Sequence, residues 1–79
     1  MLLSELRKGS TATITQIKAS SALRDRFYSF GIMRGEDVLL KECSLVRQTI
    51  EVQIGATLIA LRIDEAEQIE IDTNSHWEL

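Results

Sequence analysis

Apolar and polar residues alternate most regularly between residues 47 and 54, where Ile50, Val52 and Ile54 are separated by polar side chains. An alternation with a period of two predicts a β-strand that buries one face and exposes the other. Four further segments are short and apolar or rich in β-branched residues, as strands are: residues 11–18, 36–42, 57–62 and 68–72. The pattern therefore predicts five short strands.

The breaks in this pattern predict how the strands are joined. Ile17 is out of step with Ala12 and Ile14 by one place, and a β-bulge would keep it on the buried face. Gly55 permits the reversal between the third and fourth strands. Residues 43–46 are the predicted turn before the third strand, although they contain neither Gly nor Pro.

One segment has the spacing of a helix instead. Leu23, Phe27 and Phe30 repeat at four and three residues, which places them on one stripe of a helix that Ser20 or Ser21 can cap. So short a helix is marginal in isolation, so we expect all three apolar side chains to be buried against the strands.

The same helix has a clear stop signal. Gly31 suits the left-handed position that ends a helix, and Ile32 can then fold back onto Phe27 as in a Schellman motif. Gly35 supplies a second permissive position before the next strand. We therefore predict a mainly β fold, a small and strongly bent β-barrel of about five strands with one inserted α-helix that covers an open end.

The length of 79 residues predicts one domain, residues 1–79, with a core at about 3–72 and a tail at 73–79. The single cysteine, Cys43, excludes an internal disulfide. No apolar run approaches the roughly 20 residues of a membrane helix, and Glu5 interrupts the N-terminus where a signal peptide would be apolar. We therefore expect a cytoplasmic protein.

Charge is unevenly distributed along the chain. Residues 1–62 hold nine Lys or Arg and six Asp or Glu, whereas residues 63–79 hold six Asp or Glu and no basic residue. The net charge of −3 argues against a general nucleic-acid binder. The acidic C-terminal part is interpreted as a solvated edge.

Groups for catalysis or metal binding are scarce. The only histidine, His76, lies in the tail, and Asp64, Glu65 and Glu67 fall on one predicted exposed helical turn. Catalysis needs an acid, base or nucleophile held in a cleft, and iron(II) favours a preorganised set of imidazole and carboxylate ligands. We expect neither an enzyme nor a bound cofactor or metal, with Cys43 as a small apolar filler or a free thiol.

A set of residues along the chain resembles a known family. They are Leu3, Leu6, Gly9, Ala12 and Ile14, then Arg26-Phe27, then Phe30-Gly31-Ile32-Met33-Arg34-Gly35 and Val38, then Gly55, Ala60-Leu61-Arg62, Ala66, Ile69 and Ile71. This pattern is similar to that of the FeoA family, ferrous iron transport protein A. The resemblance implies an SH3-like small barrel with an inserted helix. It also implies a cytosolic component of bacterial ferrous iron uptake that acts with FeoB, a membrane transporter.

Five residues are candidates for contact with that partner. Arg24 and Tyr28 share one flank of the predicted helix, Arg26 lies on the other side, and Met33 and Arg34 follow at the turn. Arg and Tyr are frequent interface anchors, and Met adapts to a partner's shape. A structural interpretation stays open beside this one, in which Arg26 pairs with an acidic group near Glu67 and Tyr28 only shields the barrel.

Two other functions remain open at this point. Small barrels of this type also serve as regulatory or nucleic-acid-binding modules, including the C-terminal domains of metal-dependent repressors. Nucleic-acid binding requires a basic stripe with exposed aromatic residues, for which Arg24, Arg26, Tyr28 and Arg34 are the candidates. We do not expect nucleic acid as a partner. Weak self-association through unpaired barrel edges is compatible with either function.

Overall fold

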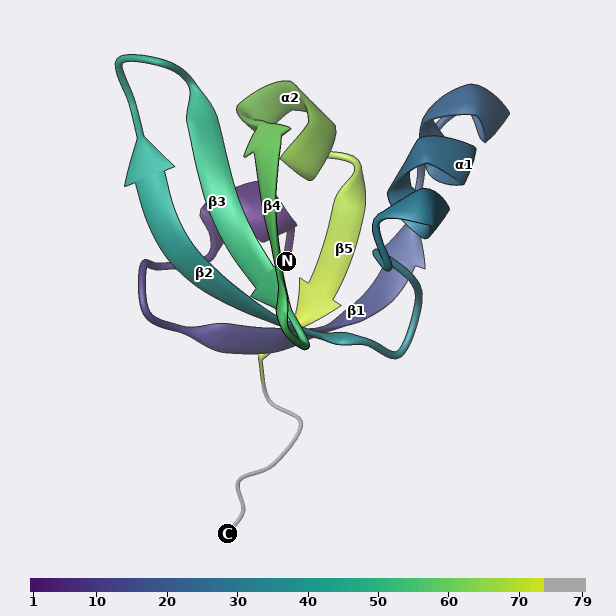
Figure 1. The fold of residues 1–79 in the computed structure, drawn as a ribbon, viewed down its shortest axis with the longest axis horizontal. Coiled ribbons are helices and arrows are strands. Elements are labelled where there is room, and N and C mark those ends of the chain that lie inside the picture. Colours follow the sequence, from purple (N-terminus) through teal and green to yellow (C-terminus); the bar gives the residue numbers. More distant parts are fainter. Residues whose placement is uncertain (74–79) are drawn as a thin grey trace, which may run out of the picture.

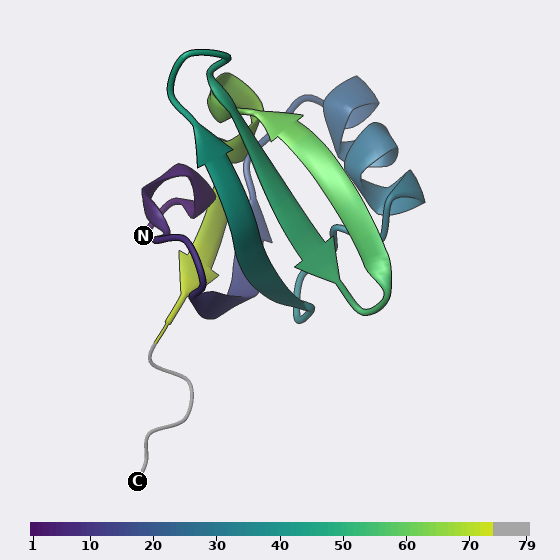
Figure 2. The same cartoon turned by 60° about the vertical axis from the view of Figure 1, so that its left-hand side comes forward.

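The computed structural model describes residues 1–73 of the chain. In chain order the elements are the 3₁₀ turn η1 (Leu3–Glu5), β1 (Thr11–Ile17), α1 (Ser21–Ser29), β2 (Asp37–Ser44), β3 (Thr49–Ile54), β4 (Thr57–Arg62), α2 (Ile63–Ala66) and β5 (Ile69–Asp72). The strands form one antiparallel sheet in the order β4-β3-β2-β1-β5. The sheet curls without closing, because β4 and β5 are its two edges (Figures 1 and 2). The predicted five-stranded bent barrel is confirmed as an open one.

The period-two pattern of β3 is reproduced by its burial. Ile50, Val52 and Ile54 are buried, and the residues between them are partly exposed. In β1 the register against β5 shifts between Ile14 and Gln16, and Ile17 beyond the shift is buried. The predicted bulge is therefore confirmed, since it restores Ile17 to the inner face.

Helix α1 begins and ends as its sequence predicts. The Oγ atom of Ser20 accepts a hydrogen bond from the Leu23 N–H at 3.3 Å. At the other end the Ile32 N–H donates to the Phe27 carbonyl at 2.9 Å and the Gly31 N–H to the Tyr28 carbonyl at 3.0 Å. These are the two bonds of a Schellman motif, and Gly31 has the required positive φ of 87°.

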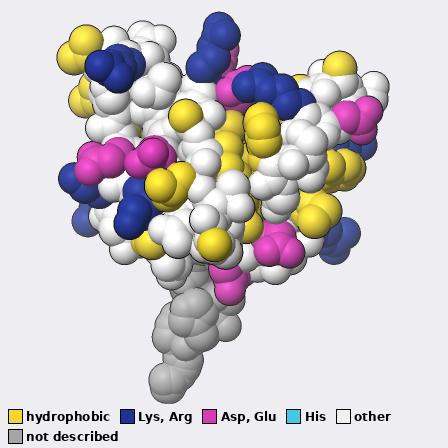
Figure 3. Space-filling model, viewed as in Figure 1, with side chains coloured by type: hydrophobic (Ala, Val, Ile, Leu, Met, Phe, Trp, Pro, Cys, Tyr) yellow, Lys and Arg dark blue, Asp and Glu magenta, His cyan; other side chains and the backbone are white. Residues whose placement is uncertain are grey.

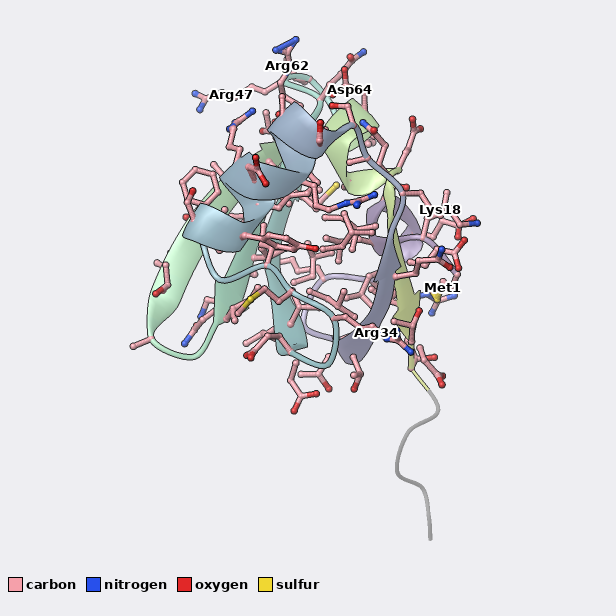
Figure 4. All side chains as sticks on the ribbon, turned by 90° about the vertical axis from the view of Figure 1, so that its right-hand side faces the viewer. Met1, Lys18, Arg34, Arg47, Arg62 and Asp64 are labelled. Carbon is pink, nitrogen blue, oxygen red and sulfur yellow. The ribbon has the colours of Figure 1, made fainter. Side chains whose placement is uncertain are left out.

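The predicted apolar stripe of α1 is wrong in one member. Phe27 is fully buried and Leu23 packs partly buried against the core, but Phe30 is 38% exposed. The Schellman reversal explains the difference, since it returns the chain under the helix and buries Ile32 instead. Helix α1 lies across the open side of the curled sheet, between β3 and β4 on one side and β1 and β5 on the other (Figure 4).

The turn between β2 and β3 was predicted too early. Strand β2 runs to Ser44, so Cys43 lies in the strand and is exposed as a free thiol rather than a filler. The turn covers residues 45–48, and Gln48 supplies the positive φ of 55° that Gly would normally supply. No residue type marked that position, which is why the sequence did not place it.

Two short helical turns complete the fold. At η1 the Glu5 carboxylate accepts the Leu2 N–H at 2.7 Å. Helix α2 begins one residue earlier than predicted, at Ile63, because the Ile63 N–H donates to the Gln48 carbonyl at 2.9 Å and fixes the end of β4. The sequence pattern did not single out either of these contacts.

Candidate partner-binding surface

Three of the five predicted contact residues line one surface hollow between β1 and α1. Its volume is about 460 Å³, and its lining residues are Thr15, Gln16, Ile17, Arg24, Tyr28 and Arg34. The structure thus brings together Arg24, Tyr28 and Arg34 from two segments of the chain. Arg26 and Met33 do not line the hollow.

Local structure places each wall of this hollow. Arg24 and Tyr28 are four residues apart on α1 and so project from the same flank. The segment after α1 is tied to β1, since the Gly35 N–H donates to the Ile14 carbonyl at 2.7 Å and the Ile14 N–H to the Glu36 carbonyl at 2.9 Å. These two bonds bring Arg34 beside β1 (Figure 4).

The hollow has a positive character. Two of its lining residues carry guanidinium groups, and no carboxylate from residues 1–73 lines it. One Arg24 nitrogen donates to the Ala19 carbonyl at 3.2 Å, which orients that side chain on α1. Tyr28 is 47% exposed and adds an aromatic face with a hydroxyl. Paired guanidinium groups and an aromatic ring can bind the carboxylates and side chains of a protein partner.

Arg26 has a different role on the opposite flank. Its Nη1 atom lies 2.6 Å from the Glu65 Oε2 atom, and its guanidinium carbon lies 5.8 Å from the centre of the Phe30 ring. Glu65 also accepts the Arg62 N–H at 3.0 Å. The structural interpretation of Arg26, an ion pair with an acidic group near Glu67, is therefore confirmed. The ion pair fastens α1 to α2.

Glu65 was expected on an exposed turn, and this was wrong. It is only 8% exposed, because Ala66 beside it is buried in the core and α2 turns that side inward. The adjacent Asp64 and Glu67 remain exposed, as predicted. A carboxylate that will be buried against an arginine from another segment cannot be told from its neighbours by local sequence.

The sequence missed the wall of the hollow formed by β1. Thr15 and Gln16 lie at the bulge, where the ladder with β5 shifts register. The one signal was the break in alternation at Ile17, which predicted the bulge but not what would face it. Met33, 41% exposed, lies on the α1–β2 connection next to Arg34.

Within residues 1–73 no three His, Cys, Asp or Glu side chains gather closely enough to hold a metal ion. The prediction about His76, like most of the predicted tail, lies outside the described residues. No helix among the described residues is long and apolar enough to cross a membrane.

The fold is thus a small open β-barrel with one inserted helix and a basic hollow between β1 and α1. Residues 1–73 match the family model of the FeoA domain. The chain is also 35% identical over 72 residues to an Fe(2+) transport protein A of Campylobacter jejuni, covering 91% of this chain and 97% of that protein. The chain belongs to the FeoA family.

Solved structures agree with this assignment. The FeoA of Stenotrophomonas maltophilia, described as an SH3 domain protein and complexed with zinc, has a TM-score of 0.82 at 33% identity. The match covers 95% of this chain and 93% of that one. The SH3-like fold is thus confirmed. A manganese-dependent transcriptional repressor shares the fold alone, with a TM-score of 0.86 at 23% identity over 92% of this chain and 41% of its own.

One relative carries the family domain within a longer protein. It is an Fe(2+) transport protein A/Fe(2+) transporter FeoB fusion protein of Porphyromonas gingivalis, 28% identical over 72 residues. The match covers 91% of this chain and 8% of the fusion protein. In that organism the domain and the transporter are therefore parts of a single polypeptide.

Proposed function

We propose that this chain is a one-domain cytoplasmic accessory protein of bacterial ferrous iron uptake that binds a FeoB-type transporter on its cytosolic side. The fusion protein of Porphyromonas gingivalis carries this proposal, because domains that are joined in one organism commonly associate as separate chains in another. In this role the protein regulates or scaffolds the transporter. It performs no catalysis and holds no cofactor of its own.

The proposed contact surface is the hollow between β1 and α1. Arg24 and Arg34 supply its positive charge and Tyr28 its exposed aromatic ring, and Met33 extends the surface along the adjoining turn. Arg26 contributes indirectly, because its ion pair with Glu65 holds α1, which carries Arg24 and Tyr28, against α2. An acidic, partly apolar segment of the transporter fits this combination, since opposite charge favours encounter and the aromatic ring anchors it.

The test is a binding measurement between this protein and the full-length transporter of the same bacterium in detergent. We expect Arg24→Glu and Arg34→Glu each to weaken binding about tenfold or more. Arg47→Glu is the matched control, because Arg47 lies on the β2–β3 turn away from the hollow. Unchanged binding of both hollow variants would rule out this surface, and absence of binding by the unaltered protein would rule out the function.

A regulatory or nucleic-acid-binding module remains the second candidate, on the single ground that a transcriptional repressor shares the fold. Fluorescence anisotropy with duplex DNA and with RNA separates the two. We expect no binding at physiological salt, given the net charge of −3. Salt-dependent binding that is lost in Arg24→Glu would favour the module instead.

A further inference from the structure

The two edges of the sheet differ in how far other parts of the chain cover them. The outer edge of β5 is partly covered by the N-terminal segment, through a bridge between Leu2 and Glu70 and a 2.8 Å hydrogen bond from the Ile71 N–H to the Met1 carbonyl. Among the described residues no strand or bridge covers the corresponding edge of β4. Hydrophobic side chains also reach the surface on the face that carries β4 and α1 (Figure 3).

The hairpin before β4 determines which backbone groups face that edge. Gly55 and Ala56 form a two-residue loop between the paired residues Ile54 and Thr57, and the φ of 59° at Gly55 fits a type II′ turn. Such a loop closes on a hydrogen-bonded pair, after which bonded and non-bonded pairs alternate. The backbone groups of Thr57 and every second residue after it therefore point to β3.

The remaining residues of β4, Leu58, Ala60 and Arg62, direct their N–H and C=O groups to the open edge. The Arg62 N–H is taken by the Glu65 carboxylate at 3.0 Å, which agrees with this direction. The N–H and C=O groups of Leu58 and Ala60 thus form a set of two donors and two acceptors on the edge.

Strand β4 also lacks several protections that the sequence of a strand can give to an edge. It contains no Pro, no Lys and no bulge, and its register with β3 is unbroken over six residue pairs. The side chains on its outer face include Leu58, which is 55% exposed, and the small Ala60. A regular, weakly charged edge of this kind favours the addition of another strand.

We propose that the β4 strands of two copies of this chain pair antiparallel around a two-fold axis at Ile59, so that Leu58 of each copy lies opposite Ala60 of the other. This register gives four hydrogen bonds between the copies and uses each of the four edge groups of Leu58 and Ala60 once. Antiparallel pairing about Ile59 also places the inner face of one sheet on the same side as the inner face of the other. This self-association is independent of the proposed function.

The occupant is a second copy because the strand is complementary to itself. In the register about Ile59 the apolar Leu58 meets the small Ala60, and Arg62 falls opposite Ala56 in the turn of the other copy, so no like charges meet. A register about Ala60 would require the Arg62 N–H, which Glu65 already holds. The proposed hollow for the transporter contains no residue of β4 and stays accessible.

The first test is sedimentation velocity over about 10 µM to 1 mM protein, a range suited to a small interface. Ala60→Pro removes an edge N–H without touching a bond to β3. We expect a concentration-dependent dimer whose dissociation constant rises at least about tenfold in this variant. A monomer throughout the range, or a dimer that Ala60→Pro leaves unchanged, would overturn the proposal.

A second pair of variants tests whether the dimer depends on the β4 edge or on exposed apolar side chains in general. Leu58→Lys places a charge on the edge, whereas Leu45→Lys replaces a side chain that is 80% exposed on the β2–β3 turn. Both changes are on the surface, so both variants should fold, as circular dichroism will verify. Only Leu58→Lys should weaken the dimer, and equal weakening by Leu45→Lys would contradict the β4 interface.

The register is tested by cross-linking in a Cys43→Ser background, which removes the exposed native thiol. An equimolar mixture of Leu58→Cys and Ala60→Cys chains should form a disulfide-linked heterodimer under mild oxidation, since these positions lie opposite each other. Leu58→Cys alone should cross-link several-fold less. Preferential cross-linking of Leu58→Cys with itself would overturn the register about Ile59.

Discussion

The two flanks of helix α1 carry the same residue type in opposite roles. On one flank Arg26 lies 2.6 Å from the buried Glu65 and above the Phe30 ring, so its charge is used inside the molecule. On the other flank Arg24 and Arg34 line an open hollow with Tyr28, and no carboxylate in the described part of the chain lines it with them. An arginine is thus available to a partner only where the fold has not supplied an acidic group.

This difference arises from what each flank faces. Arg26 projects toward α2, where Glu65 is turned inward beside the buried Ala66. Arg24 projects toward the bulged part of β1, which presents Thr15 and Gln16. Substitutions on the Arg26 flank should therefore change stability, whereas substitutions on the Arg24 flank should change binding.

The largest loss of stability is expected at Phe27, whose buried side chain anchors helix α1 and so both of its flanks. Phe27→Ala removes the one fully buried side chain of α1 and should lower the free energy of unfolding by about 3–5 kcal/mol. Chemical denaturation measures this loss. Phe30→Ala is the matched control, and its partly exposed ring should cost about 1 kcal/mol or less. Equal losses in the two variants would contradict the observed burial.

The next effect concerns the internal flank. Glu65→Ala leaves both Arg26 and the Arg62 N–H without their acceptor, and should destabilise the protein by about 2 kcal/mol. Glu65→Gln retains an acceptor for the Arg62 N–H, and its loss should be about 1 kcal/mol because Arg26 is half exposed. Denaturation of both variants checks the order, and a neutral Glu65→Ala would show that the ion pair does not fasten α1.

The open flank should show the reverse behaviour. Arg24→Gln and Arg34→Gln should change the free energy of unfolding by less than about 0.5 kcal/mol, since neither side chain has an ion pair among the described residues. Arg26→Gln, compared in the same denaturation series, should lose about 1 kcal/mol. If the three variants lost equal stability, the distinction between the flanks would fail.

The smallest effect is a pH dependence away from both flanks. The Lys18 ammonium, 2.5 Å from the Glu70 carboxylate, holds the pKa of Glu70 below its ordinary value, although burial opposes this effect. A lowered pKa in the folded state stabilises the protein above about pH 4.3, the ordinary pKa of glutamate, and this contribution is lost as the pH falls through the folded-state value.

Thermal unfolding of Glu70→Gln between about pH 2 and pH 7 tests this sign. The variant should melt slightly below the unaltered protein at neutral pH, and the two curves should converge in acid. Lys18→Gln removes the same pair from the other side and should give the same trend. A difference that grows toward low pH would contradict the assignment.

Local pattern predicted much of the fold because its signals are short-range. The alternation in residues 49–54, the bulge before Ile17 and the Gly31 helix stop each depend on neighbouring residues, and each is found in the structure. The β2–β3 turn was misplaced because Gln48 adopts a left-handed conformation that no residue type announced. The candidate contact set was predicted as five residues, and the structure unites three of them in one hollow.

Periodicity, turn residues and a motif that runs along the chain were enough to predict the strands, the capped helix and the family. The choice of Glu65 as the partner of Arg26, and the position of Arg24 and Arg34 at an open surface, became known only from the folded arrangement. The fold also leaves Phe30 partly exposed and, within residues 1–73, covers part of the outer edge of β5 but not that of β4. These outcomes depend on which distant segments meet, and a local pattern contains no information about charges or backbone groups contributed by the other side of a contact.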